Sequence, residues 1–171
     1  AEVKYKDNLM NAYDNSIRYT DNFLARIIHL LKQQQVDASM LYTSDHGEDI
    51  FDDGRHLFLH ASPVPSYYQL HVPLLLWTSD SYREEYPGIE KAASMNRQTN
   101  ISSSISFFQT MMELAGIETP YRNDSLSVTS PLYTEKSRVY LNDHNEPHSL
   151  DDIGMRKEDF EMLKKRGIDA Q

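Results

Sequence analysis

Apolar residues recur at helical spacing in two parts of the chain. The first such run predicts a helix from about Asp7 to Gln35. Its apolar face is formed by Tyr13, Ile17, Leu24, Ile27, Ile28 and Leu31. The second run predicts a helix from Thr99 to Ala115, which Asn100 or Ser102 would cap and Gly116 would close. Its apolar side is expected to consist of Ile101, Ile105, Phe108, Met112 and Ala115.

Two continuous apolar runs have the length of strands rather than helices. They span Ala38 to Ser44 and His71 to Trp77. Such runs are typical of strands buried on both faces, and Pro73 must lie at a strand start or at an irregularity because proline donates no ladder hydrogen bond. We expect the two runs to be neighbouring, mostly buried strands of one sheet. The helices around Ile27 and Phe108 are expected to pack on its faces.

The rest of the chain is more polar, and we expect it to contain more loop and fewer helices and strands. The expected segments are a loop from Asp45 to Gln69, an irregular stretch from Ser79 to Asn96, a short strand from Arg138 to Leu141, a loop from Asp143 to Asp152 and a helix from Met155 to Lys165. Helices and strands joined by crossover-length connections predict an α/β layered domain with a mainly parallel sheet.

Composition narrows the classes of function. The 171 residues suffice for one domain, and the formal net charge of -9 leaves no basic face for a nucleic acid. The chain has no cysteine, which excludes disulfides, thiolate metal sites and a cysteine nucleophile. No apolar run approaches the length of a membrane span. The chain begins inside what reads as the approach to a helix, so we expect a piece of a longer protein.

Chemistry concentrates where the first predicted strand ends. Asp45 and His46 follow the strand directly, and Gly47 comes next. The carboxyl edge of an open α/β sheet is where such folds bind ligands. Oxygen and nitrogen ligands together suit zinc or a similar divalent ion better than calcium or magnesium. The dipeptide alone is more typical of a turn that satisfies local backbone groups, and only the segments that follow in the sequence favour the metal site.

The other histidines carry weaker signals. His56 and His60 lie in the loop after the first strand and remain candidates for the same site. His71 is expected to hold its loop through a hydrogen bond. A solvated surface role is expected for the remaining three, His29, His144 and His148.

Several segments resemble the bacterial lipid A phosphoethanolamine transferases, a family in the alkaline phosphatase and sulfatase superfamily. They occur in the family's order over about residues 8 to 120. The segments are Tyr13–Asp21, similar to the helix before the metal strand; Ser44–Glu48, similar to the metal motif; Leu59-His60, similar to a Leu-His-Gly site with Ala61 in place of glycine; His71–Leu74, similar to a His-Val-Pro strand; and Asn100–Ile117, similar to the late helix and its Leu-Ala-Gly-Ile end.

The resemblance implies a three-layer α/β/α, alkaline-phosphatase-like fold, of which residues 1–171 would be the C-terminal portion and an incomplete domain. In the family, zinc is held by a Glu, a nucleophilic Thr and an Asp-His pair, and Asp45 and His46 match that pair. Another divalent metal is possible. The Thr takes phosphoethanolamine from a phospholipid donor and passes it to a lipid A or other glycan acceptor. His60 matches a catalytic histidine on the substrate side.

The resemblance also implies what the chain lacks. The family's nucleophile and metal-binding Glu lie upstream of residue 1, so the isolated piece is expected to be soluble, inactive and at most a weak zinc binder. Its partner would be the missing N-terminal half, and the parent protein would sit in the inner membrane with its catalytic domain in the periplasm. The loop between His46 and His60 is two residues longer than usual, and Ser103-Ser104 replace a His-Asp pair.

Two alternatives stay open. One is a sulfatase or phosphatase hydrolase of the same superfamily, although the lysine usual in sulfatases is not evident between Ala61 and His71. The other is a non-catalytic binding module.

Overall fold

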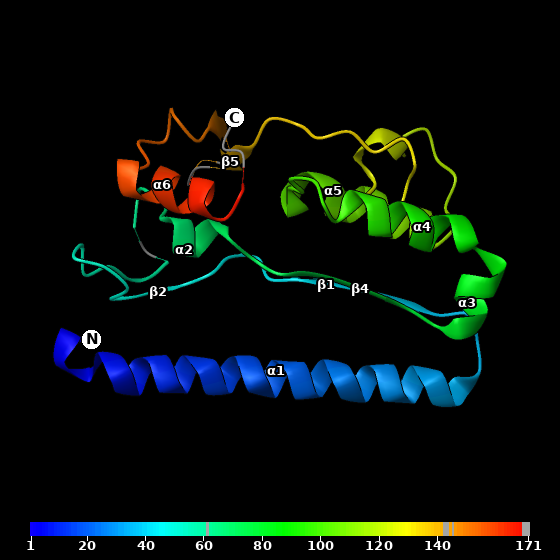
Figure 1. Ribbon diagram of the computed structural model, residues 1–171, viewed down its shortest axis with the longest axis horizontal. Helices are drawn as coiled ribbons and strands as arrows, with labels where there is room; N and C mark the ends of the chain where they lie inside the picture. The colour runs from blue at the N-terminus through cyan, green and yellow to red at the C-terminus, as the bar shows by residue number, and fades with distance from the viewer. Residues whose placement is uncertain (61, 142–143, 145, 169–171) are drawn as a thin grey trace. The chain divides into compact units, whose positions relative to one another are not determined.

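A computed structural model describes residues 1–60, 62–141, 144 and 146–168 (Figure 1). The helices are α1 (Lys6–Gln34), α2 (Tyr67–Leu70), α3 (Asp80–Glu85), α4 (Pro87–Asn96), α5 (Ser103–Leu114) and α6 (Lys157–Lys165), with 3-10 turns η1 (Val3–Tyr5) and η2 (Asp124–Leu126). The strands are β1 (Ser39–Thr43), β2 (Asp49–Ile50), β3 (Phe58–Leu59), β4 (Leu74–Thr78), β5 (Val139–Leu141) and β6 (Pro147–Ser149).

The chain divides into two compact units. Unit 1 contains Ala1–Gln33, Ser44–Pro73 and Val139–Ala170, and unit 2 contains Gln34–Thr43 and Leu74–Arg138. The candidate site residues after β1 all belong to unit 1.

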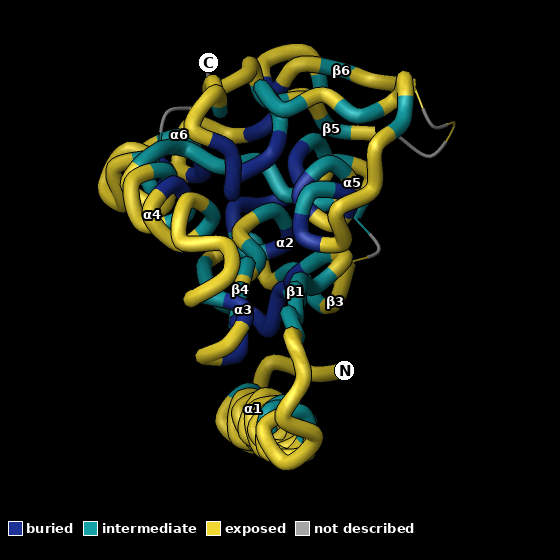
Figure 2. The backbone as a smooth tube through the Cα atoms, turned by 90° about the vertical axis from the view of Figure 1, so that its right-hand side faces the viewer, coloured by how far each residue is buried: buried dark blue, intermediate teal, exposed yellow. Residues whose placement is uncertain are grey.

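The first predicted helix is confirmed, since α1 runs from Lys6 to Gln34. It ends where Gln35 adopts a left-handed backbone with φ of 54°, a conformation that stops a helix. None of its residues is buried, and Figure 2 shows the helix exposed along most of its length. The predicted apolar face is half-buried except at Ile17, which is exposed.

The two apolar runs form neighbouring strands, as predicted, but their pairing is antiparallel. In unit 2, Ser39 lies opposite Thr78 and Thr43 lies opposite Leu74. All three strand pairs of the described residues are antiparallel, so these residues contain no part of a parallel sheet. A parallel pair needs a crossover connection, whereas the segment between these strands turns back on itself, and its Gly47 N–H donates to the Gln69 carbonyl at 2.8 Å.

The prediction that these strands are mostly buried is also wrong. All five residues of β1 are half-buried, and in β4 only Thr78 is buried. An apolar run shows that a strand tolerates burial. The elements that pack on the strand decide how much of it is buried. In unit 2, α5 contacts β1.

The polar stretch from Ser79 to Asn96, predicted to be irregular, forms two helices instead. Ser79 caps α3, and its hydroxyl accepts the Tyr82 N–H at 3.2 Å. Pro87 begins α4, a position where proline's missing N–H costs nothing. These local start signals outweigh the weak apolar periodicity of the segment.

The second long helix, α5, is shorter than predicted but closes as predicted. Ser102 is its N-cap residue, although its side chain makes no capping hydrogen bond. Gly116 has φ of 63°, and Ile117 N–H donates to the Met112 carbonyl at 2.9 Å, the geometry of a glycine-closed helix end.

The predicted apolar side of α5 is wrong in part. Phe108 is 61% exposed, whereas two hydroxyl residues, Ser106 and Thr110, are buried together with Met112 and Leu114. The Thr110 hydroxyl accepts the Val128 N–H at 3.0 Å, so a polar loop covers this side of the helix.

The core of unit 1 is built around α2 and α6. Its buried members are Tyr67, Leu150, Met155 and Leu163. The short strand predicted from Arg138 to Leu141 is β5, and it pairs with β6, which lies in a segment predicted to be a loop. Residues 143 and 145 of that predicted loop lie outside the described residues. The late helix is confirmed as α6.

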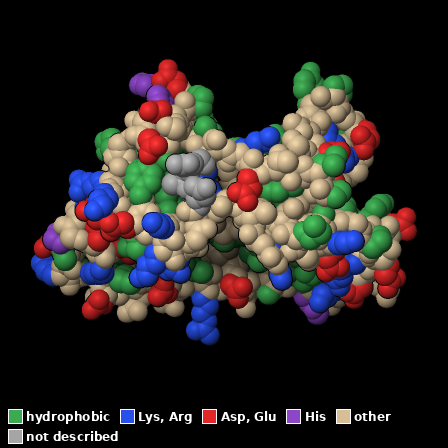
Figure 3. Space-filling model, turned by 45° about the horizontal axis from the view of Figure 1, so that its top comes forward, with side chains coloured by type: hydrophobic (Ala, Val, Ile, Leu, Met, Phe, Trp, Pro, Cys, Tyr) green, Lys and Arg blue, Asp and Glu red, His purple; other side chains and the backbone are tan. Residues whose placement is uncertain are grey.

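Two surface properties bear on function. No described helix combines the length and the apolar character that crossing a membrane requires. On the face shown in Figure 3, Lys and Arg side chains are interspersed with Asp and Glu.

Candidate metal centre

The turn after β1 is held by its own polar groups. The Ser44 hydroxyl donates to the His46 carbonyl at 2.7 Å, and the His46 N–H donates to Asp45 Oδ1 at 3.1 Å. This backbone hydrogen bond is the main reason that the pKa of Asp45 lies below its ordinary value. The Asp45 side chain is 88% exposed, so its carboxylate stays ionised and accessible.

Gly47 is required by a close approach of two backbone segments. A Cβ at this position would lie 2.0 Å from the Tyr68 carbonyl oxygen, which no side chain can tolerate. The Gly47 N–H donates to the Gln69 carbonyl at 2.8 Å. The glycine in the motif therefore lets the metal loop lie directly against α2.

Asp49 anchors the same loop from its other side. Its buried carboxylate accepts the Ser66 hydroxyl at 2.8 Å and the Gln69 side-chain amide at 2.5 Å. Ser66 also caps α2, because its hydroxyl accepts the Gln69 N–H at 3.3 Å. Glu48 thus lies between two residues that are both fixed against α2.

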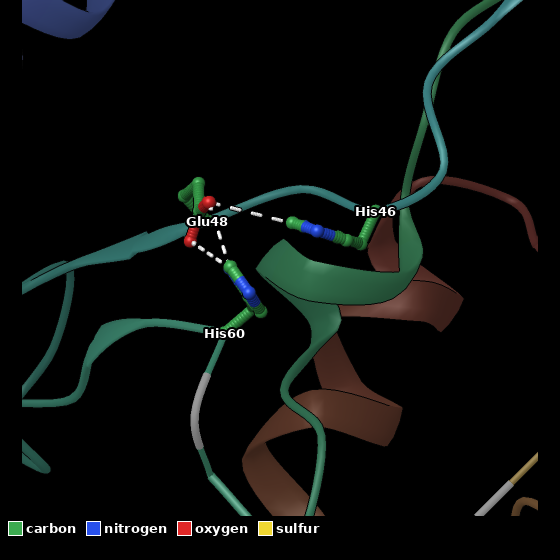
Figure 4. Close-up of side chains that lie close together, drawn as sticks. All are labelled: His46, Glu48 and His60. Carbon is green, nitrogen blue, oxygen red and sulfur yellow. Dashed lines mark hydrogen bonds and ion pairs between the residues drawn. The ribbon is translucent and has the colours of Figure 1, made fainter.

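The β2–β3 hairpin brings His60 back to this loop. Asp49 pairs with Leu59 in the hairpin, and His60 follows Leu59 directly. His60 Nδ1 lies 2.9 Å from Glu48 Oε1 and 3.1 Å from Oε2. The rings of His46 and His60 have centroids 3.9 Å apart. Figure 4 shows Glu48 linked to both imidazoles.

His46 has different neighbours at its two ring nitrogens. Nδ1 lies 3.0 Å from the Gly47 carbonyl, and Nε2 lies 3.7 Å from Asp45 Oδ2. A carbonyl oxygen only accepts, so Nδ1–H donates to it, and Nε2 is turned toward the Asp45 carboxylate. A histidine that binds a metal commonly donates its second N–H to a backbone carbonyl in this way.

The structure brings some of the residues predicted from the sequence together and separates others. His46 and His60 lie together, and Asp45 lies beside His46 on the side away from Glu48. Glu48, which the sequence reasoning did not assign, joins them: one ligand atom each of His46, Glu48 and His60 lie within 4.8 Å of one another. Its signal was present, because Glu48 belongs to the same motif and immediately precedes β2.

The other histidines lie in ordinary surroundings. His56 is exposed in the hairpin turn, where its backbone has φ of 55° and its N–H donates to Asp53. His71 Nδ1 lies 2.8 Å from the Tyr67 hydroxyl, which gives it a structural partner. His29 lies 3.0 Å from Gln33 on the surface of α1.

The residues present have the chemistry of a zinc site. Imidazole nitrogens and carboxylate oxygens are zinc donors, and catalytic zinc sites commonly use three protein ligands. Donors of a tetrahedral zinc ion with bonds of about 2.0 Å lie roughly 3.3 Å apart. The 3.7 Å between Asp45 Oδ2 and His46 Nε2 is close to that spacing.

Residues 1–117 match the family model described as Sulfatase, which is more than half of the chain. The chain belongs to the sulfatase family. Phosphoethanolamine transferase EptA of Escherichia coli K12 is 36% identical over 120 residues, which cover 68% of this chain and 22% of the relative. The Kdo(2)-lipid A phosphoethanolamine 7''-transferase of the same organism is 28% identical over 120 residues, covering 67% and 20%. The chain thus spans about a fifth of the length of these relatives.

Solved structures agree with this assignment. The C-terminal periplasmic domain of Escherichia coli EptC in complex with Zn is similar with a TM-score of 0.72 and 26% identity, over 88% of this chain and 41% of that one. The corresponding domain of EptC from Campylobacter jejuni has a TM-score of 0.67 and 27% identity, over 79% and 43%. These neighbours confirm the α/β, alkaline-phosphatase-like fold class, and this chain is part of such a domain.

Proposed function

We propose that this chain is the C-terminal portion of the catalytic domain of a zinc-dependent phosphoethanolamine transferase. The enzyme would move phosphoethanolamine from a phospholipid to lipid A or another glycan acceptor. The observation that carries the proposal is the exposed imidazole of His60, which Glu48 holds beside His46 in a chain similar to named phosphoethanolamine transferases. The relative named for Kdo(2)-lipid A supports the choice of acceptor.

Asp45 and His46 are proposed to hold the metal. Asp45 offers an ionised, exposed carboxylate, and His46 offers Nε2 on the same side. When bound, zinc or another divalent ion would supply Lewis-acid stabilisation of phosphoryl charge and lower the pKa of an attacking hydroxyl. We further propose that the nucleophile and a remaining ligand come from a part of the protein outside these 171 residues.

His60 is proposed to act on the substrate. Its Nδ1–H donates to Glu48, which fixes the ring and leaves Nε2 to meet a phosphoryl oxygen or a leaving group. The side chain is 52% exposed, so a substrate reaches it without rearrangement of the loop. An imidazole that a carboxylate orients in this way suits proton transfer to or from a substrate.

The location follows from the same relatives. The similar EptC structures are described as C-terminal periplasmic domains. We propose that the intact protein is anchored in the inner membrane with this domain in the periplasm, where phospholipid donors and lipid A are both accessible.

The test uses the intact protein with a phosphoethanolamine lipid donor, and measures transfer and bound zinc separately. Asp45→Ala and His46→Ala should lose both the metal and the activity. His60→Ala should retain the metal while turnover falls by about 10²–10⁴-fold, the usual contribution of a proton-transfer group. His29→Ala, on the exposed surface of α1, is the matched control and should change neither. Full activity after both metal-ligand substitutions would overturn the proposal.

The isolated chain provides a second test. With two proposed metal ligands of its own and no nucleophile, it should bind zinc weakly or not at all in calorimetry and transfer nothing. Donor turnover by these 171 residues alone would contradict the assignment of the nucleophile to another part of the protein.

A hydrolase of the same family is the second candidate, and the match to the sulfatase model supports it. An intact protein that cleaves aryl sulfates or phosphate esters, with no transfer of phosphoethanolamine, would establish this alternative. Binding of the lipid without turnover in any assay would indicate a non-catalytic module.

A further inference from the structure

A buried carboxylate on α6 reaches both segments that support the candidate site. Asp159 is 1% exposed, and its Oδ1 accepts the Tyr67 N–H at 2.9 Å and Arg55 Nη2 at 2.9 Å. Its Oδ2 accepts Arg55 Nη1 at 2.6 Å. One side chain therefore joins the start of α2 to the turn of the β2–β3 hairpin.

Arg55 makes the hairpin side of this junction rigid. Its guanidinium also donates from Nε to Asp53 Oδ1 at 3.0 Å and from Nη2 to Asp53 Oδ2 at 2.6 Å. The two carboxylates raise the pKa of Arg55 above its ordinary value, so its charge is permanent. A planar guanidinium between two carboxylates fixes direction as well as distance, because each pair forms two parallel hydrogen bonds.

Both contacts of Asp159 lead to the imidazole cluster by short paths. Tyr67 begins α2, and the α2 residue Gln69 holds Gly47 and Asp49 on either side of Glu48. On the other path, Arg55 fixes the turn that leads into β3 and His60. Releasing Asp159 would loosen the supports of Glu48 and His60 together.

We propose that Asp159 is a positioning residue for the proposed transferase site, and that it acts through Arg55 and the start of α2. The inference rests on the proposed function for its chemical meaning. The inference goes beyond that function because α6 lies outside residues 1–117, the part of the chain that matches the family. A segment beyond the matched region thereby sets the alignment of His60 with Glu48 and His46.

The test measures the cluster directly, by NMR of the 171-residue chain without metal. Asp159→Asn keeps the size of the side chain but removes its charge and turns an amide donor toward Arg55. The inter-ring contacts between His46 and His60 should disappear from nuclear Overhauser spectra. Exchange of the Gly47 amide should become at least about tenfold faster, while the Ser79 amide of unit 2 keeps its rate.

Two control variants separate positioning from general destabilisation. Glu158→Gln removes the same charge from the exposed neighbouring position and should leave the spectra unchanged. Leu163→Ala opens the buried core beneath the same helix and should lower stability, yet it should preserve the His46–His60 contacts in the folded protein. If Asp159→Asn does not fold, Arg55→Lys serves instead, since it keeps the charge but loses the paired hydrogen bonds, and the same loss of contacts is expected.

Unchanged ring contacts between His46 and His60 and an unchanged exchange rate of the Gly47 amide in folded Asp159→Asn or Arg55→Lys would overturn the proposal. So would the same spectral loss in Leu163→Ala. These readouts need neither zinc nor a lipid. The proposed transferase activity can therefore fail without affecting this result, and the reverse also holds.

Discussion

Both units bury polar side chains, but they use them for different purposes. In unit 1 the buried polar side chains lie between the metal loop, α2 and α6, and they include two carboxylates; they are Asp49, Ser66, Gln69 and Asp159. In unit 2 they are mostly hydroxyls between α5 and the loop that follows it. Among the described residues, no buried side-chain nitrogen or oxygen lacks a hydrogen-bond partner. Hydrogen bonding is complete in both regions, so its completeness does not distinguish a functional site from a structural one.

The network of unit 2 is centred on Glu113. This carboxylate accepts the hydroxyls of Ser127 and Thr129 and lies 3.7 Å from Arg122. Ser127 and Thr129 belong to the buried loop after η2, so these bonds hold that loop on α5. No imidazole belongs to the network, and its bonds supply partners for groups that folding removes from water.

The network of unit 1 ends differently. The buried Asp49 directly follows Glu48, and the buried Asp159 holds the hairpin that leads to His60. The side chains of Glu48 and His60 are both at least partly accessible. In unit 1, buried charged side chains hold accessible titratable groups in place, as a functional site requires. In unit 2, buried hydroxyls hold the backbone of a loop, as packing requires. The following four predictions test that contrast.

The largest effect is expected for Arg55→Ala in unit 1. The substitution leaves the buried Asp159 without its cation, and removing one partner of a buried pair typically costs about 3–5 kcal/mol. Denaturant unfolding should show this loss. A cost near zero would mean that the charged network contributes no more than a surface ion pair and would remove the contrast.

Gly47→Ala should have the next largest effect. The added Cβ would meet the Tyr68 carbonyl oxygen at 2.0 Å, and forcing the backbones apart is expected to cost about 1–3 kcal/mol or more. Gly88→Ala in unit 2 is the matched control, because its Cβ would meet nothing within 4 Å. That variant should gain roughly 0.5 kcal/mol, since alanine loses less backbone entropy in a helix than glycine. Thermal unfolding of both variants compares the two sites.

A smaller effect is expected for Glu113→Gln in unit 2. The amide oxygen still accepts a hydroxyl, so only the charge assistance is lost, at about 1–2 kcal/mol. Glu118→Gln, an exposed partner of the same Arg122, should stay within about 0.5 kcal/mol of the original chain. Neither variant should shift the NMR signals of His46 and His60. A shift would show that the hydroxyl network is not purely structural.

The smallest effect is expected in the dependence of stability on acidic pH. Hydrogen bonds from Arg55 lower the pKa of Asp53 below its ordinary value of 3.8. A depressed carboxyl contributes stability above its unfolded pKa and loses it as pH falls through the lower folded value. Stability should therefore decline below about pH 4, and Asp53→Asn should flatten that part of the profile. Denaturant titrations between pH 2 and 6 compare the stability profiles of the original chain and of Asp53→Asn. This range extends roughly two units on either side of the ordinary aspartate pKa.

Local signals were sufficient for much of the chain. Apolar spacing predicted α1 to within one residue at each end, and Gly116 predicted where α5 closes. The motif at residues 44–48 set Asp45 and His46 side by side, because hydrogen bonds between neighbouring residues hold this turn.

Contacts between distant residues decided the rest. β1 and β4 pair antiparallel, and a segment that turns back on itself connects them, which no apolar pattern encodes. The exposure of Phe108 follows from a hydroxyl-lined loop that covers the other side of α5. Arg55 and Asp159 are separated by 104 positions, so their pairing exists only once α6 packs beside the hairpin. Periodicity and capping act over a few residues, whereas burial and charge pairing depend on which segments the folded chain brings together.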